Sequence, residues 1–421
     1  MPKLHRKIPA WVWQMLLMGL LGLSGIIFVP VLLRWADPPL MATVLVAQVY
    51  VYYLVVLVQF GFAWSGPAAL VKAKHALGVA QVWRSSVSAK LLLLLVPVGL
   101  MFGVGLVSLA WGQWYLLWFV LLLAAFAVNS NWFLQAQHNF AAGVVFAAVG
   151  VCVCVLMLWA LVGGWLGADE LVGEGAWVVL LLVLPQVCLG VGSWWLARNA
   201  CAGTEVAEVT DAHWRDSLGL LRKDAPLVAS QLLLLASTTL GTVVVGQLAD
   251  ADITAAYAAT EKLFNLGATV LVGLYMALYP RLASLFYADC CVYWEKIKLI
   301  LLVCAGGGLG LAALMAFVGP VLIGLYLPSH MAMLVVPVLS PFALWLGLCI
   351  SQHLLTSCLV LAEQHQMVLW ANGWVLVVTL LVGYAFASNT PVAWVYGMLV
   401  GQLLALVWLL VLYRKDRAIC L

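Results

Sequence analysis

Charged residues are scarce in this 421-residue chain, in which 8% of the residues are charged and 66% are hydrophobic. Soluble domains contain about 25% charged residues. No charged residue occurs in residues 91–168 or in residues 299–362, stretches of 78 and 64 residues. Each stretch exceeds the ~20 residues that one helix needs to cross the hydrocarbon core of a bilayer. The composition therefore excludes a soluble enzyme, a nucleic-acid-binding protein and a disordered scaffold.

The usual signatures of catalysis and metal binding are also missing. The sequence has no C-x-x-C pair, P-loop, G-x-S-x-G or H-E-x-x-H motif, and its ten cysteines lie mostly within apolar runs. One D-x-D motif, formed by Asp250 and Asp252, lies in a short predicted turn with no large loop around it. The sequence thus predicts no enzyme activity, no cofactor and no metal site.

Polar residues divide the apolar sequence into about twelve predicted membrane-spanning helices. The runs are continuous in Leu, Val and Ala, unlike the short alternating strands of a membrane β-barrel. We therefore predict an all-α polytopic membrane protein. The longest connection is a cytoplasmic linker loop (198–222). It separates an N-terminal six-helix bundle (1–197) from a C-terminal six-helix bundle (223–421). The predicted spans are residues 10–33, 41–66, 86–108, 114–137, 141–163, 176–197, 223–248, 254–280, 298–323, 331–361, 366–387 and 391–413.

Basic residues predict the orientation of these helices, because the cytoplasmic loops of membrane proteins are enriched in Lys and Arg. With the N-terminus in the cytoplasm, 17 of the 19 basic residues fall in cytoplasmic segments, when Lys90, near the cytoplasmic end of the predicted span 86–108, is counted with them. Arg34 falls on the outer side, and Lys262 falls within a span. The first apolar stretch is too long for a typical secretory signal peptide. We expect a multi-pass protein with both termini in the cytoplasm.

The two predicted halves share a weak internal repeat at an offset of 213 residues. Asp37 corresponds to Asp250 and Pro67 to Pro280, so that each Asp is followed by a Pro 30 residues later. Both halves begin in the cytoplasm, so the repeat is parallel and its axis lies along the membrane normal. Transporters with internal repeats usually bind substrate where the repeats meet. The pattern predicts two pseudo-symmetric six-helix bundles around a central cavity.

Ionisable residues inside a membrane are costly and usually functional. Lys262 either lines a hydrated cavity or extends toward the interface with Glu261 as its counter-charge. Arg34 is either the cationic rim of the cavity or an interfacial anchor. Glu261 is the best candidate to take up a proton if transport is proton-coupled. Uncharged polar residues in spans either bond across helices or line water, and the candidates for the cavity are Gln48, Gln59, Asn131, Gln135, Gln231, Gln352 and His353.

Several short motifs resemble those of the Wzx-type polysaccharide flippases, the O-antigen or repeat-unit transporters of the multidrug/oligosaccharidyl-lipid/polysaccharide exporter superfamily. Residues 30–38 (PVLLRWADP) and 58–72 (VQFGFAWSGPAALVK) are similar to the family motifs of the first two spans. Residues 132–137 (WFLQAQ) resemble the family's W-x-x-Q-G-x-E but lack its Gly and Glu. Residues 256–262 (AYAATEK) and 278–284 (LYPRLAS) are close to the motifs of the eighth span.

This resemblance implies a flippase of the bacterial inner membrane that acts by alternating access. It implies transport of an oligosaccharide on undecaprenyl pyrophosphate from the cytoplasmic to the periplasmic leaflet, for O-antigen and lipopolysaccharide synthesis. Arg34 and Lys262 are then expected to meet the diphosphate, and the polar amides to meet the sugars. Membrane lipids and glycan polymerase or ligase machinery are the implied partners, and proton or sodium coupling is left open. The alternatives are a drug or metabolite antiporter of the same superfamily, and a membrane glycan polymerase or ligase.

Overall fold

The computed structural model is a polytopic all-helical membrane protein, and its described residues contain helices and turns but no strand. The chain divides into two compact units, unit 1 (1–228) and unit 2 (229–421). The described residues are 9, 12–22, 28, 38–72, 76–110, 114–137, 139–163, 173–202, 212–248, 257–258, 260–265, 267–269, 271, 282, 284–286, 288–326, 329–362, 364–386 and 391–416.

Unit 1 is a bundle of helices in which α8 occupies a central place. Helix α8 packs against α7, α5, α6 and η1, and α4 packs against α5, η1, α2 and α3. Gly190 lets α8 approach α5 closely, because a Cβ at this position would collide with the backbone carbonyl oxygen of Ala125. The helices are α2 (Pro38–Gln59), α3 (Phe62–Lys72), α4 (Ala76–Ala110), η1 (Trp114–Trp118), α5 (Phe119–Val128), α6 (Asn131–Ala136), α7 (Phe140–Val162) and α8 (Gly173–Cys201).

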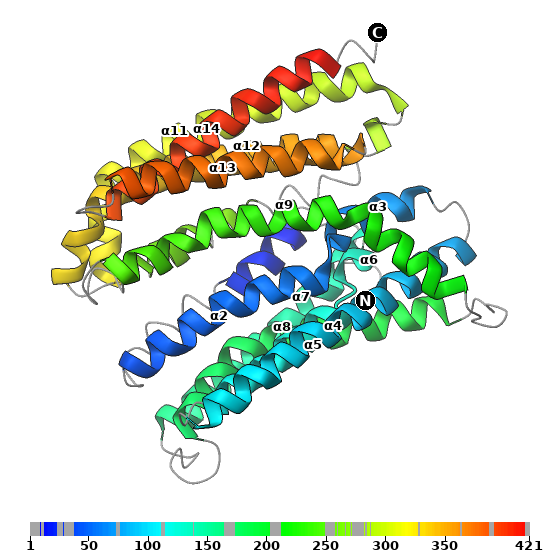
Figure 1. The fold of residues 1–421 in the computed structure, drawn as a ribbon, viewed down its shortest axis with the longest axis horizontal. Coiled ribbons are helices and arrows are strands. Elements are labelled where there is room, and N and C mark those ends of the chain that lie inside the picture. The colour runs from blue at the N-terminus through cyan, green and yellow to red at the C-terminus, as the bar shows by residue number, and fades with distance from the viewer. Residues whose placement is uncertain are drawn as a thin grey trace. The chain divides into compact units, whose positions relative to one another are not determined.

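Unit 2 contains four long helices that run side by side (Figure 1). They are α11 (Cys290–Tyr326), α12 (Ser329–Leu361), α13 (His365–Phe386) and α14 (Pro391–Asp416). Helix α9 (Ala212–Leu248) begins in unit 1 and continues into unit 2. The core of unit 2 combines aliphatic and aromatic side chains, and the ring of Phe342 stacks on that of Phe264 with 5.1 Å between centroids. Helices α11 and α12 touch through their backbones, since a Cβ on Gly308 would lie 2.7 Å from Cα of Gly347.

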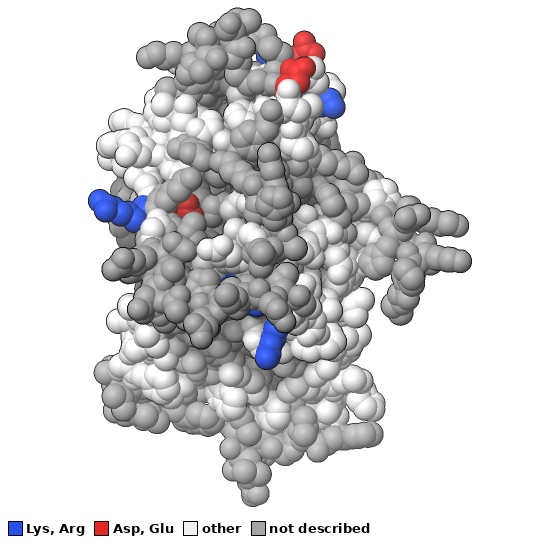
Figure 2. Space-filling model, turned by 90° about the vertical axis from the view of Figure 1, so that its right-hand side faces the viewer, with Lys and Arg blue, Asp and Glu red and all other residues white. Residues whose placement is uncertain are grey.

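Eight helices of the described residues are long and apolar enough to cross a membrane, and two shorter apolar helices cover 12–22 and 47–59. Large apolar side chains cover their outer surfaces, for example Phe317, which is 82% exposed on α11. On the face shown in Figure 2, few of the described side chains are charged. In water such a surface would be strongly unfavourable, whereas lipid tails are as apolar as these side chains. The total of twelve spans, the repeat and the orientation stay predictions.

Two spans predicted as single helices are interrupted in the structure. The predicted helix 41–66 divides at Phe60 and Gly61, which have φ angles of 45° and 75°. A positive φ is costly for most residues and easy for glycine, so Gly61 permits this division. The predicted helix 114–137 divides at Asn129 and Ser130, between α5 and α6. The expectation of one uninterrupted helix was therefore wrong at these two places, while residues 115–136 still form one candidate membrane span.

The predicted loop 198–222 is helical where the structure describes it, apart from a turn at residue 202. Helix α8 extends to Cys201 and α9 already begins at Ala212. Both helices carry charged residues at these ends, and a helix can continue beyond the hydrocarbon into water while keeping its own hydrogen bonds. The expectation of a loop was therefore wrong for these described residues. The bundle boundaries at 197 and 223 stay predictions.

Candidate functional site

The interruption between α5 and α6 is a break in a membrane-spanning helix, and side chains from two other helices bond to it. Ser193 of α8 accepts a hydrogen bond from the backbone N–H of Ser130 at 3.0 Å. Trp83 of α4 donates its indole N–H to the Ser130 hydroxyl at 3.0 Å. Asn129 bonds locally, because its Oδ1 accepts from the backbone N–H of Asn131 at 2.9 Å. Irregular backbone at membrane depth is tolerated where protein groups satisfy it in this way.

Lys90 makes a further bond at the break. Its Nζ donates to the backbone carbonyl of Asn129 at 2.9 Å, and the side chain is only 3% exposed. We predicted Lys90 to be a cytoplasmic basic residue and Lys262 to be the one basic residue within a span. That prediction was wrong, because α4 starts at Ala76, so that Lys90 lies in the interior of the 78–103 span.

The predicted site residues of unit 1 lie on three elements. Gln48 is half-buried on α2 and hydrogen-bonds Tyr52 one turn along the same helix. Gln59 is half-buried at the last residue of α2. Asn131 and Gln135 lie one turn apart on α6 and are each 7% exposed. Asn131 Oδ1 is buried without a hydrogen-bond partner among the described residues. Arg34 lies outside the described residues.

In unit 2, the buried carboxylate of Glu261 is held by a neighbouring helix. Thr242 of α9 donates its hydroxyl to Glu261 Oε2 at 2.8 Å, and Glu261 is 5% exposed. Lys262 is half-buried beside it. One turn before Glu261, the hydroxyl of Tyr257 is buried with no hydrogen-bond partner in the described part of the chain. The structure therefore pairs Glu261 with Thr242 and leaves the role of Lys262 as a prediction.

A second buried polar group of unit 2 joins four helices through a chain of hydrogen bonds. Gln402 of α14 donates to Gln352 of α12, and Gln352 donates to Asn372 of α13. Asn372 Nδ2 donates to the Ser230 hydroxyl of α9 at 2.6 Å and to the Ser230 carbonyl at 3.2 Å. All four residues are at most 2% exposed. The Gln352 amide therefore forms hydrogen bonds with two other helices in this structure. Its contact with substrate stays a prediction.

The other two predicted residues of unit 2 lie near this chain of hydrogen bonds in sequence. Gln231 follows Ser230 on α9 and is half-buried, and His353 follows Gln352 on α12 and is also half-buried. Residues one position apart on a helix point about 100° away from each other. Gln231 and His353 therefore face other directions than the residues that form the hydrogen-bond chain.

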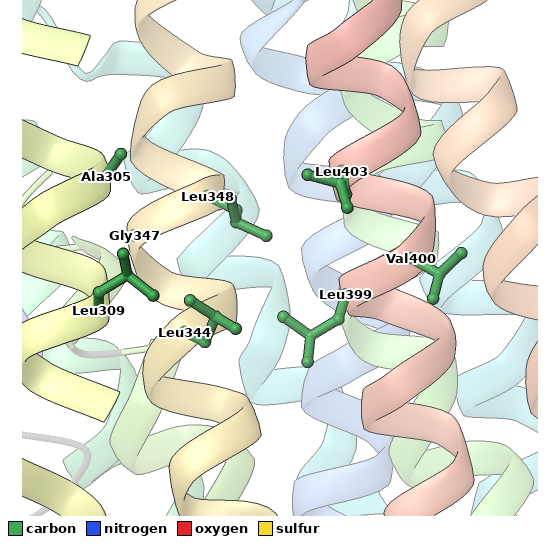
Figure 3. Close-up of a pocket in the computed structure, with 8 residues that line it drawn as sticks. All are labelled: Ala305, Leu309, Leu344, Gly347, Leu348, Leu399, Val400 and Leu403. Carbon is green, nitrogen blue, oxygen red and sulfur yellow. The ribbon is translucent and has the colours of Figure 1, made fainter. Parts of the chain in front are cut away.

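An apolar pocket of about 300 Å³ lies between α11, α12 and α14 of unit 2 (Figure 3). Its lining offers no polar side chain, so it can take hydrocarbon but gives no hydrogen bond to a sugar or a phosphate. The residues that line it are Ala305, Leu309, Leu344, Gly347, Leu348, Leu399, Val400 and Leu403.

Sequence reasoning missed several buried polar residues. Asn372 and Gln402 lie within the predicted spans 366–387 and 391–413, so their polarity at membrane depth was a usable signal. Gln14 is a further case, because it is fully buried and both of its amide atoms lack a partner among the described residues. Asp224, at the start of the predicted span 223–248, is 2% exposed and accepts a hydrogen bond from Ser65. Only the three-dimensional structure reveals these partners.

A family model described as polysaccharide biosynthesis protein matches residues 10–286. The chain belongs to this family. The comparison with curated proteins found no match.

Solved transporter structures share the fold of this family member. A eukaryotic MATE transporter is 15% identical with a TM-score of 0.73, over 98% of this chain and 97% of its own. A Vibrio cholerae MATE transporter, solved as an Asp-to-Asn mutant, is 16% identical with a TM-score of 0.69, over 97% and 96%. An inward-facing multidrug resistance MATE family transporter of the MOP superfamily is 15% identical with a TM-score of 0.64, over 98% and 96%. At these identities the likeness establishes a transporter fold.

Proposed function

We propose that this chain is a flippase that moves an oligosaccharide linked to undecaprenyl pyrophosphate from the cytoplasmic to the periplasmic leaflet of a bacterial inner membrane. The family match over residues 10–286 carries this proposal, because it joins polysaccharide biosynthesis to a chain with a transporter fold. Both termini lie in the cytoplasm, and the glycan polymerase or ligase machinery acts on the product.

Physical chemistry supports a protein path for such a substrate. A diphosphate with attached sugars carries charges and many hydroxyl groups, which lose their hydration in hydrocarbon at high cost. The polyprenyl tail is apolar and stays in the lipid during transport. Lys262 and Arg34 supply positive charge for the diphosphate, and amides such as Gln135 supply donors and acceptors for the sugars.

Complementation of a flippase-null strain tests this proposal, with surface glycan as the readout and membrane abundance as the control. The wild-type chain is expected to restore surface glycan. Lys262→Ala should abolish most of the export at normal abundance, and Lys262→Arg should retain much of it, because the diphosphate requires positive charge. Full export by Lys262→Ala would remove Lys262 from the substrate path.

A drug antiporter of the same superfamily is the second candidate, since the structurally similar proteins include a multidrug resistance transporter. A drug-sensitive strain that expresses this chain separates the two functions. Lower accumulation of a cationic dye, without any restored surface glycan, would favour the antiporter and contradict the flippase proposal.

A further inference from the structure

Lys90 is a buried amine at the break between α5 and α6, and the described residues around it provide no anion to hold its charge. Among these residues, its one polar partner is the carbonyl oxygen of Asn129. The sequence has no Asp or Glu between Asp37 and Asp169. The helices that pack extensively on α4 in unit 1, namely α2, α3, η1 and α5, all lie within this acid-free stretch.

The titratable groups on the neighbouring elements cannot replace a carboxylate. On α4 itself the nearest is Arg84, which is cationic and half-buried. Helix α8 reaches the break through Ser193, and its Glu174 is 19 residues away from that serine, a distance of ~28 Å along a helix. Asp224 of α9 accepts its hydrogen bond from Ser65 of α3. The remaining titratable residues of α2, α3, η1 and α8 are Tyr50, Tyr52, Tyr53, Lys72, Tyr115, Cys188, Arg198 and Cys201.

A carbonyl oxygen, unlike a carboxylate, does not restrict the protonation state of a lysine that donates to it. An ammonium and a neutral amine both have N–H groups, so either form donates to the oxygen of Asn129. A carboxylate would instead hold the ammonium charged. The geometry at the break is thus compatible with both protonation states, while an isolated buried ammonium is costly.

The broken helix provides polar groups around this amine. Ser130 and Ser193 lie at the break and bond to each other there, whereas Asn131 Oδ1 lies against Gly143 of α7. Discontinuous helices in transporters commonly carry the sites of coupling ions. A water that reaches the break would find serine hydroxyls and the lysine.

From this geometry we infer that Lys90 is a proton-exchange group of the transport cycle, charged in one state of the protein and neutral in another. This inference rests on the proposed transport function and places a proton carrier in unit 1, separate from Glu261 in unit 2. The proton leaves Lys90 to water at the break and returns to the same nitrogen later in the cycle.

Competitive acylation of the purified full-length protein measures the protonation of individual lysines without any transport substrate. Only neutral amines react, so the rate of each lysine follows its own titration. Lys90 is expected to react, because a group that exchanges its proton with water must reach its neutral form while the protein stays folded, and the exposed Lys296 and Lys298 are the internal controls for delivery of the reagent. A Lys90 that does not react at any pH, in a sample whose Lys296 is acylated, overturns the inference.

Matched arginine variants then distinguish proton exchange from phosphate binding. Arginine keeps its charge throughout, so Lys90→Arg is expected to lose most of the export at normal abundance, whereas Lys262→Arg retains it. Retained export by Lys90→Arg would overturn the inference. If the wild-type chain exports no glycan, the proposed function fails, while the acylation profile still decides whether Lys90 exchanges a proton.

Discussion

Ser65 of α3 donates its hydroxyl to Asp224 Oδ2 of α9 at 2.6 Å, within unit 1. The carboxylate is almost fully buried, and it lies four residues before the boundary between the units. This bond attaches the first half of α9 to α3, next to the division of the second predicted span at Gly61.

Removal of this bond should destabilise unit 1. Ser65→Ala leaves a buried carboxylate with one partner fewer, at a cost of about 1–3 kcal/mol. The apparent melting temperature in detergent is expected to fall, while Ser88→Ala, at a half-buried serine of α4, changes it little. The double variant with Asp224→Ala should lose less than the sum of the single variants, and strictly additive losses would contradict a direct coupling.

The hydrogen-bond chain through Asn372 should stabilise unit 2 when it is intact, and a partly broken chain should lower the thermal stability of the protein. Asn372→Ala leaves the amide of Gln352 and the hydroxyl of Ser230 with fewer partners, at a cost of about 1–3 kcal/mol for each unsatisfied buried group. Replacement of Gln352, Asn372 and Gln402 together by Leu should recover part of this loss, because Ser230 still loses a partner but no buried amide is left unsatisfied. Thermal stability measures both variants, and Gln366→Ala, at an exposed position, is the control. A triple variant less stable than Asn372→Ala would contradict this account.

Gly347 should tolerate no side chain. A Cβ there would collide with the backbone of α11 at Gly308, so Gly347→Val is expected to lower membrane abundance sharply. Gly306→Val is the matched control, because a Cβ on Gly306 meets nothing within 4 Å. Equal abundance of the two variants would show that the helices separate without penalty.

Glu261 is expected to act through its charge and not only through its bond to Thr242. Glu261→Gln keeps an acceptor for the threonine hydroxyl but can no longer take up a proton, so export should fall while abundance stays near wild type. Thr242→Val removes the hydroxyl and keeps the carboxylate, and it should retain more export than Glu261→Gln. The complementation assay measures both, and full export by Glu261→Gln would exclude a proton-carrying role.

The predicted orientation can be tested in a cysteine-free background. A cysteine at Glu170 should react with a membrane-impermeant thiol reagent in intact cells, and a cysteine at Glu208 only after permeabilisation. This expectation follows from the sorting of basic residues between the two sides. The reverse pattern would invert the topology.

The sequence was sufficient for the fold class, because long uncharged stretches leave few alternatives to membrane helices. It was insufficient where a span contains its own interruption. Residues 129–131 (NSN) are polar at mid-span, but their meaning depends on Trp83, Lys90 and Ser193, which α4 and α8 bring to them. From hydropathy alone, a span with a few such polar residues is still predicted as one continuous helix.

The same limit applies to the candidate site. Glu261 was identified because carboxylates are rare in spans, and the structure adds its bond to Thr242. Lys90 was counted with the cytoplasmic residues because it lies only four residues inside the predicted span 86–108, whereas α4 already begins at Ala76. The partners of Gln352 come from residues 372 and 402, and a single sequence holds no information on which amides meet across helices.

Backbone contact between Gly308 and Gly347 has a consequence for movement within unit 2. Helices that interlock through long side chains can slide past each other when those side chains change rotamer. Two backbones in contact have no such adjustable layer between them. Helices α11 and α12 should therefore turn together as one stiff body, and spin labels placed on the two helices should keep the same separation in every state of the transport cycle.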